Sequence, residues 1–189
     1  MNILIDTLPK GVIIDNIPYK INSDFRVSLM FSILLDDKEI EDEFKFNKAL
    51  ELYYPIIPHD EEKAIASIMW FYRCGKEIEE DKSNKDNSNN NIILDYEQDA
   101  DYIYSAFMSQ YNIDLQDVEY LHYWKFKSLF ENLNEDNKIV EIMKYRCINL
   151  NDIKDYNEKQ FYKKMKKIYG LKEEKISEGE KIDLRNEWG

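Results

Sequence analysis

Histidine and cysteine are the side chains whose spacing in this sequence could support metal binding or nucleophilic catalysis. The two histidines, His59 and His122, lie at metal-ligand spacing neither from each other nor from the cysteines, Cys74 and Cys147. Protein zinc sites need several such ligands close together. We therefore expect no zinc site. His122, which lies in the aromatic stretch 120–124, is expected to be a packed or partly exposed side chain rather than a general base.

Carboxylates form the second candidate constellation, because Asp95, Glu97, Asp99 and Asp101 alternate along one short segment. Carboxylate oxygens suit calcium and magnesium ions, but the glycine and the distal glutamate of a calcium-binding loop are missing. Acidic residues in the first turn of a helix also interact favourably with the positive end of the helix dipole. We favour the dipole interpretation and keep a divalent-cation site as the alternative.

Motifs of the common enzyme families are absent from the sequence. It holds 5 glycines and has no GxGxxG fingerprint, no Walker loop and no GxSxG elbow. The sequence thus predicts a protein that is not an enzyme and that needs neither cofactor nor metal. A small metal-dependent hydrolase built around Asp95, Asp99, Asp101 and His122 is a distant alternative.

Aromatic side chains are concentrated in one stretch of a predicted helix. The predicted protein-binding residues in it are Tyr120, Tyr123, Trp124, Phe126 and Phe130. Because aromatic residues occur on more than one side of this helix, the helix is either central to a bundle or exposed to a partner. Core packing is the simpler interpretation. The alternative is a groove that receives the apolar face of a partner helix.

Residues 1–75 predict an N-terminal lobe made of a hairpin and three helices. Apolar residues at 12–14, the turn pair Asp15-Asn16 and alternation over 17–21 are typical of a β-hairpin. Helical spacing then predicts helices over 25–37, 47–54 and 61–75.

The rest of the chain predicts a second helical lobe. Residues 76–94 are rich in asparagine and are expected to form a flexible linker, and residues 171–189 a charged mobile tail. Between them, the C-terminal lobe of residues 95–170 should contain helices over 96–112, from Asp114 or Asp117 to 130, over 137–147 and over 155–169. The expected fold class is mainly α, a helical bundle with a small N-terminal β-hairpin.

Charge and hydropathy limit the partners of this 189-residue chain. With 38 acidic and 26 basic residues, its net charge of -12 repels phosphate backbones, so nucleic acid is not an expected partner. No apolar run approaches the roughly 18 residues of a membrane span, and the N-terminus lacks the features of a secretory signal. We expect a cytoplasmic protein with reduced cysteines and no membrane partner.

Basic residues gather near the C-terminus, where Lys163, Lys164, Lys166 and Lys167 lie on one predicted helix. A solvated helix face is the favoured interpretation of this segment. The alternative is that it pairs with an acidic surface of a neighbouring copy.

Long stretches of the chain resemble a known family. They are DYEQDADYIYSAFMSQYNIDLQDVEYLHYWKFKSLFENL, LPKGVIIDNIPYKINSDFRVSLMF, KIVEIMKYRCINL and NEKQFYKKMKKIYG. Together they resemble the bacteriophage Gp-fifteen family of Gram-positive siphophages and prophages. The resemblance covers both predicted lobes and leaves the asparagine-rich segment and the tail unassigned.

The resemblance implies a role in tail assembly, because members of that family are encoded between the major tail protein and the tape measure protein. It implies a chaperone of the host cytoplasm that binds the tape measure protein and keeps it soluble until tail tube subunits polymerise around it. Other chaperone copies and the tail tube protein are further candidate partners. The alternative is a structural component, a tail tube or tail completion protein, that is retained in the virion.

Overall fold

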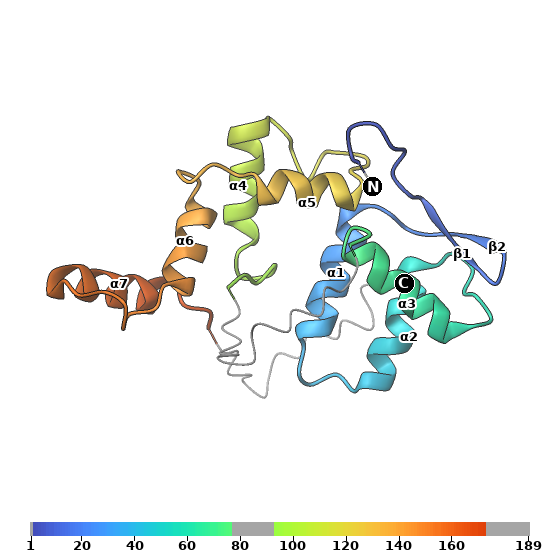
Figure 1. Ribbon diagram of the computed structural model, residues 1–189, viewed down its shortest axis with the longest axis horizontal. Coiled ribbons are helices and arrows are strands. Elements are labelled where there is room, and N and C mark those ends of the chain that lie inside the picture. Colours follow the sequence, from blue (N-terminus) through green and yellow to red (C-terminus); the bar gives the residue numbers. More distant parts are fainter. Residues whose placement is uncertain (1, 77–92, 173–189) are drawn as a thin grey trace.

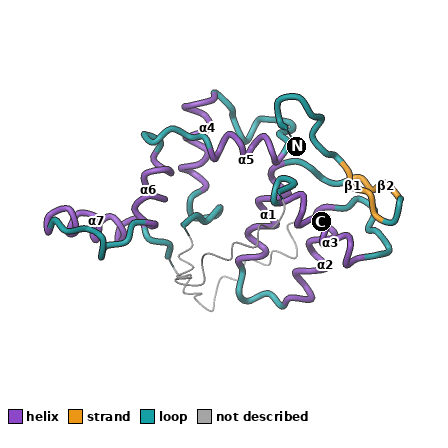
Figure 2. The backbone as a smooth tube through the Cα atoms, in the orientation of Figure 1, coloured by secondary structure: helices purple, strands orange, loops and turns teal. Residues whose placement is uncertain are grey.

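The computed structural model describes residues 2–76 and 93–172, which form a mainly helical protein with one β-hairpin, as the sequence predicts (Figures 1 and 2). In chain order the elements are β1 (Gly11–Ile14), β2 (Ile17–Lys20), α1 (Phe25–Asp36), α2 (Asp42–Tyr53), α3 (Glu61–Tyr72), α4 (Ala100–Tyr111), α5 (Tyr123–Glu131), α6 (Lys138–Cys147) and α7 (Tyr156–Tyr169). The predicted linker and tail lie almost entirely outside the described residues. None of these helices is long and apolar enough to cross a membrane.

The predicted hairpin is confirmed. β1 and β2 pair antiparallel, with Ile14 opposite Ile17. Asp15 and Asn16 between them have φ angles of 51° and 64°, the left-handed conformation that two-residue hairpin turns require. At Gly11, a Cβ atom would lie 2.7 Å from the carbonyl oxygen of Tyr19, so close pairing at this position needs glycine.

Two of the three N-terminal helices begin where the sequence predicts. The Asp24 carboxylate accepts the Arg26 N–H at 3.0 Å, which caps α1, and the Asp60 carboxylate accepts the Lys63 N–H at 3.0 Å, which caps α3. The prediction that the middle helix starts at 47 is wrong, because α2 begins at Asp42. Acidic residues in the first turn of α2 stabilise this start, because they interact favourably with the positive end of the helix dipole.

The C-terminal half departs from the sequence prediction in one important place. The helix expected to start at Asp114 or Asp117 begins only at Tyr123, with His122 as its N-cap. The Asp114 carboxylate instead accepts the Gln116 N–H at 2.8 Å, which closes a local turn. α4 likewise begins later than predicted, at Ala100, whereas α6 and α7 match their predicted ranges.

The extended residues before α5 pair with the N-terminus of α1. We call residues 23–25 and 121–123 the junction. The Phe25 N–H donates to the Leu121 oxygen at 2.9 Å, and the Tyr123 N–H donates to the Ser23 oxygen at 2.9 Å. The Leu121 N–H also donates to the Asp24 carboxylate at 3.1 Å. One aspartate thus caps α1 and holds the segment that starts α5.

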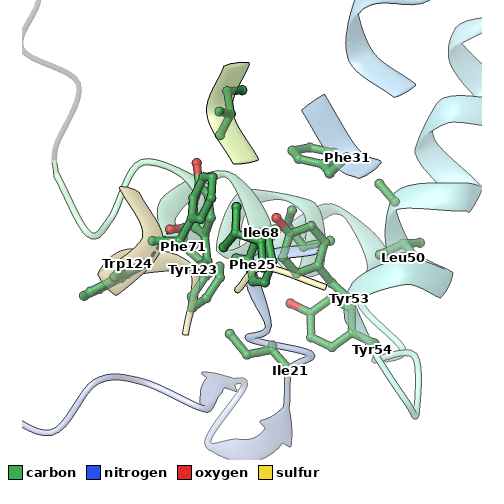
Figure 3. Packing of buried hydrophobic residues seen from close by; sticks show 14 of the residues in the cluster. Ile21, Phe25, Phe31, Leu50, Tyr53, Tyr54, Ile68, Phe71, Tyr123 and Trp124 are labelled. Atoms are coloured by element: carbon green, nitrogen blue, oxygen red, sulfur yellow. Dashed lines mark hydrogen bonds between the residues drawn. The ribbon is translucent and has the colours of Figure 1, made fainter. Parts of the chain in front are cut away.

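Buried side chains from both halves of the sequence form one cluster (Figure 3). The Phe126 ring of α5 stacks on Phe25 of α1 and on Phe107 of α4, each at a centroid distance of 4.9 Å. The boundary predicted between the two lobes therefore divides the sequence but not the core, because Phe126 of α5 packs against helices from both halves.

A buried ion pair joins the helices farthest from the hairpin. Asp99 is 1% exposed and accepts hydrogen bonds from the Arg146 guanidinium at 2.5 and 2.9 Å. Arg146 also donates to the carbonyl oxygens of Tyr169 at 2.7 Å and Ile93 at 2.9 Å. Asp99 is thus neither a simple helix-dipole residue nor an ion ligand, because it neutralises a buried arginine that links α4, α6 and the end of α7.

Replacement of Arg146 by leucine should destabilise the fold by about 3–5 kcal/mol, because it leaves the Asp99 carboxylate buried without its counter-charge. Urea denaturation measures this change. The double variant Asp99→Asn, Arg146→Leu is the control and should lose much less than the sum of the two single changes. A loss below about 1 kcal/mol for Arg146→Leu would contradict this account.

Candidate protein-binding surface

The five predicted binding residues do not share one accessible face. Tyr123, Trp124 and Phe126 are only 2%, 5% and 1% exposed. Tyr120 is 44% exposed and lies before α5, and Phe130 is half-buried. Partner binding by this set stays a prediction, but in this conformation most of it is enclosed by the protein itself.

The enclosed aromatic residues have partners within the chain (Figure 3). The Tyr123 ring stacks on Tyr72 at 5.6 Å, and the Trp124 indole N–H donates to the Phe71 carbonyl oxygen at 2.7 Å. Phe126 lies between two further rings, and Phe130 stacks on it at 6.2 Å. These contacts support the core interpretation of the aromatic stretch, and a charged residue at Tyr123 or Trp124 would disrupt the fold before it could report on binding.

Tyr120 is the accessible member of the set. Its hydroxyl group is 2.8 Å from the Ser23 Oγ, and the Lys10 ammonium lies 5.0 Å from its ring centroid. These contacts fix the ring beside the junction while its surface stays exposed.

An open pocket of about 220 Å³ lies beside Trp124. Its lining combines apolar and charged side chains: Ile3, Leu8, Cys74, Lys76, Trp124, Lys127, Ser128 and Glu131. Gly75 at the end of α3 has a φ of 71°, and a Cβ there would lie 3.0 Å from the Trp124 ring. Glycine therefore lets the chain turn closely over the indole.

Exposed apolar residues continue from the pocket lining. Ile3, which lines the pocket, is 42% exposed, and its neighbours in the sequence, Leu4 and Ile5, are 88% and 80% exposed. Trp70 is 37% exposed, and its ring lies edge-to-face against Trp124 at 5.6 Å. We call the pocket lining, together with Leu4, Ile5 and Trp70, the Trp124 pocket surface. Sequence reasoning missed it, and its one signal was the apolar triplet at positions 3–5, which belongs to no periodic element.

The titratable groups of this surface do not suggest catalysis. Burial raises the pKa of the Cys74 thiol to about 11, so the thiol is protonated and weakly nucleophilic at neutral pH. The Lys127 ammonium lies over the rings of Tyr72 and Tyr123, at 5.6 and 5.9 Å.

Residues 2–76 and 93–172 bring together no group of three His, Cys, Asp or Glu residues that could hold a metal ion, so the alternative cation site of Asp95, Glu97, Asp99 and Asp101 is not assembled.

His122 is a packed side chain, as the sequence predicts. It is 2% exposed, its Nδ1 accepts the Trp124 N–H at 3.1 Å, and its Nε2 lies 2.9 Å from the Pro9 carbonyl oxygen. Because a carbonyl oxygen can only accept, Nε2 carries the proton and the ring is neutral. Burial is the main cause that lowers the pKa of His122 below its ordinary value, and the Pro9 carbonyl partly opposes it.

The lowered pKa of His122 predicts acid sensitivity. The unfolded chain binds a proton at His122 near pH 6.5, whereas the folded chain does so only at lower pH. The free energy of unfolding should therefore decrease as the pH falls from about 7 to about 5, below the unfolded pKa. Urea midpoints at these pH values test this. His122→Asn, which keeps a capping side chain, should lose this dependence, and His59→Asn at an exposed position should keep it.

The two thiols should react at different rates. Cys147 is exposed, whereas Cys74 is partly buried and has a raised pKa. Maleimide labelling near pH 7.5 should therefore modify Cys74 at least roughly tenfold more slowly than Cys147, as peptide mass spectrometry can show. Equal rates would mean that the end of α3 opens readily.

Comparison with known proteins assigns the family. No curated protein and no solved structure matches the chain. The family described as Bacteriophage Gp15 protein matches residues 4–171, which include every element from β1 to α7. The chain therefore belongs to the Bacteriophage Gp15 protein family.

Proposed function

We propose that this protein is a tail assembly chaperone that binds the phage tape measure protein in the host cytoplasm and keeps it soluble. Membership of the Gp15 family supports a phage role. The observation that carries the proposal is the Trp124 pocket surface, where large apolar side chains stay exposed beside an open pocket. The proposed role involves no catalytic step, metal or cofactor.

The shape and chemistry of this surface suit an apolar helix. Contiguous exposed apolar side chains beside a pocket are typical of protein-binding surfaces. A residue from the apolar face of a tape measure helix would enter the pocket against Trp124, while Leu4 and Ile5 cover its neighbours. Lys127 and Glu131 line the same pocket and would meet polar groups at the edge of that helix.

A chaperone must also release its cargo. The pocket is small, so each contact should be weak, and many copies along one elongated cargo would supply avidity that tail subunits can remove copy by copy. The net charge of -12 would keep the chaperone and its cargo soluble. Weak single sites on an acidic chain therefore fit a transient role.

Co-expression with the tape measure protein tests the proposal. The native chain should increase the soluble fraction of the tape measure protein and co-purify with it. The variant Leu4→Asp, Ile5→Asp should reduce co-purification at least roughly tenfold, because it places charge in the apolar contact. Both side chains are largely exposed, so its unfolding free energy should stay within about 0.5 kcal/mol of the native value.

A matched control makes the same charge change elsewhere. Ile13 and Ile56 are 75% and 76% exposed, and the variant Ile13→Asp, Ile56→Asp should still co-purify with the tape measure protein. If the native chain leaves the tape measure protein as insoluble as before, the chaperone proposal fails. Recovery of this protein from purified phage particles would support the alternative, a structural tail component.

A further inference from the structure

Helix α7 presents an apolar face that the described part of the chain covers only in part. It projects from the end of the molecule distant from the hairpin (Figure 1), and none of its residues is buried. Phe161 and Ile168 are 48% and 53% exposed, and their spacing places them on one side of the helix with Lys164. The Tyr145 ring of α6 packs along α7 and contacts Phe161, Tyr162 and Tyr169 at centroid distances of 6.2, 6.2 and 5.8 Å, which leaves about half of Phe161 exposed.

The segment that contains α7 is also basic, although the whole chain is acidic. Residues 154–170 hold six lysines and two acidic residues, a local charge of +4. The Lys166 ammonium donates to the Arg146 carbonyl oxygen at 2.9 Å. The ammonium groups of Lys163, Lys164 and Lys167 form no ion pair with any described residue.

The turn between α1 and α2 has the opposite character. We call residues 35–44 the acidic corner. They hold six carboxylates and one lysine, a charge of -5, and Leu35 and Phe44 within them are 41% and 47% exposed. The six carboxylates are Asp36, Asp37, Glu39, Glu41, Asp42 and Glu43. None of them makes an ion pair within residues 2–76 and 93–172.

Local contacts hold the corner together and leave most of its charge without an ion-pair partner among the described residues. The Lys45 ammonium donates to the Leu35 carbonyl oxygen at 2.9 Å, which ties the start of α2 to the end of α1. Partial burial is the main cause that raises the pKa of Asp36, the nearby Asp95 carboxylate adds to it, and the Lys45 ammonium partly opposes it. The corner thus matches α7 in both respects, with exposed apolar side chains among charges of the opposite sign.

We propose that α7 of one copy docks on the acidic corner of a second copy. The two surfaces lie apart within one molecule (Figure 1), so they can contact each other without a change of fold only when they belong to different copies. Because they are different surfaces, the contact is heterologous, and a chain of any number of copies keeps one free α7 at one end and one free corner at the other. The product is an open chain of copies. This inference does not require a tape measure protein, although such a chain would suit an elongated cargo.

Sedimentation analysis of the full chain tests this proposal. In about 0.02 M salt, the weight-average mass should increase with protein concentration. In about 1 M salt, where the Debye length falls to about 3 Å, the association should weaken. The variants Lys164→Glu, Lys167→Glu on α7 and Asp42→Lys, Glu43→Lys on the corner should each weaken it at least roughly tenfold, since they bring like charges together.

A mixture of the two variants separates a heterologous contact from a symmetric one. The α7 variant keeps a native corner and the corner variant keeps a native α7, so an equimolar mixture should associate again. The variant Lys20→Glu, Lys125→Glu makes the same charge change at other exposed positions and should associate like the native chain. Thermal unfolding should show that all of them remain folded at the assay temperature, because the altered side chains are exposed. The corner variant and the α7 variant should unfold at slightly lower temperatures than the control, because each places charge of the unfavourable sign at a helix end.

A native chain that stays monomeric at every concentration and salt level would overturn the proposal. So would a mixture that fails to associate, or an α7 variant that behaves like the Lys20, Lys125 control. A monomeric chain that still co-purifies with the tape measure protein would overturn this inference and leave the proposed chaperone function standing.

Discussion

The pairing of residues 23–25 with residues 121–123 is the constraint on which the rest of the structure depends. It joins segments separated by about a hundred residues of chain through three backbone N–H groups, two donating to carbonyl oxygens and one to the Asp24 carboxylate. Asp24 caps α1 at the same time, so the start of one helix and the approach to another share a single side chain. Once they are joined, Phe126 must lie between α1 and α4, and Trp124 must lie against the end of α3.

This constraint decides which aromatic residues remain accessible. Stacked and edge-to-face rings contribute about 0.5–1.5 kcal/mol each beyond the burial of their area, so the rings of α5 are held strongly in the core. The accessible apolar surface moves to residues that surround them, namely the N-terminal residues 3–5 and Trp70. The aromatic stretch thus contributes to the proposed binding surface mainly through Trp124, which lines the pocket.

Local signals predicted most of the fold. Asp15-Asn16 forms a turn and Asp60 forms a helix cap, and the geometry of both depends only on residues close by in the sequence. The hairpin and α3 could therefore be predicted from the sequence. The start of α5 could not, because residues 118–122 have helical spacing in the sequence, whereas in the structure Leu121 and His122 belong to the junction with residues 23–25. The pairing of Asp99 with Arg146 and the pocket lining also join distant residues, and no local pattern specifies such contacts. For the same reason, the aromatic stretch could be identified from sequence but not assigned to core or surface.

Hydrogen exchange of the purified complex with the tape measure protein tests the central claim most directly. Bound cargo should slow amide exchange in residues 2–9 and 70–76, at the Trp124 pocket surface, and should leave residues 123–126 as protected as in the free protein. Faster exchange at residues 123–126 in the complex, with no protection of residues 2–9, would show that the aromatic core itself opens to receive the cargo. That result would contradict the pocket surface as the binding site.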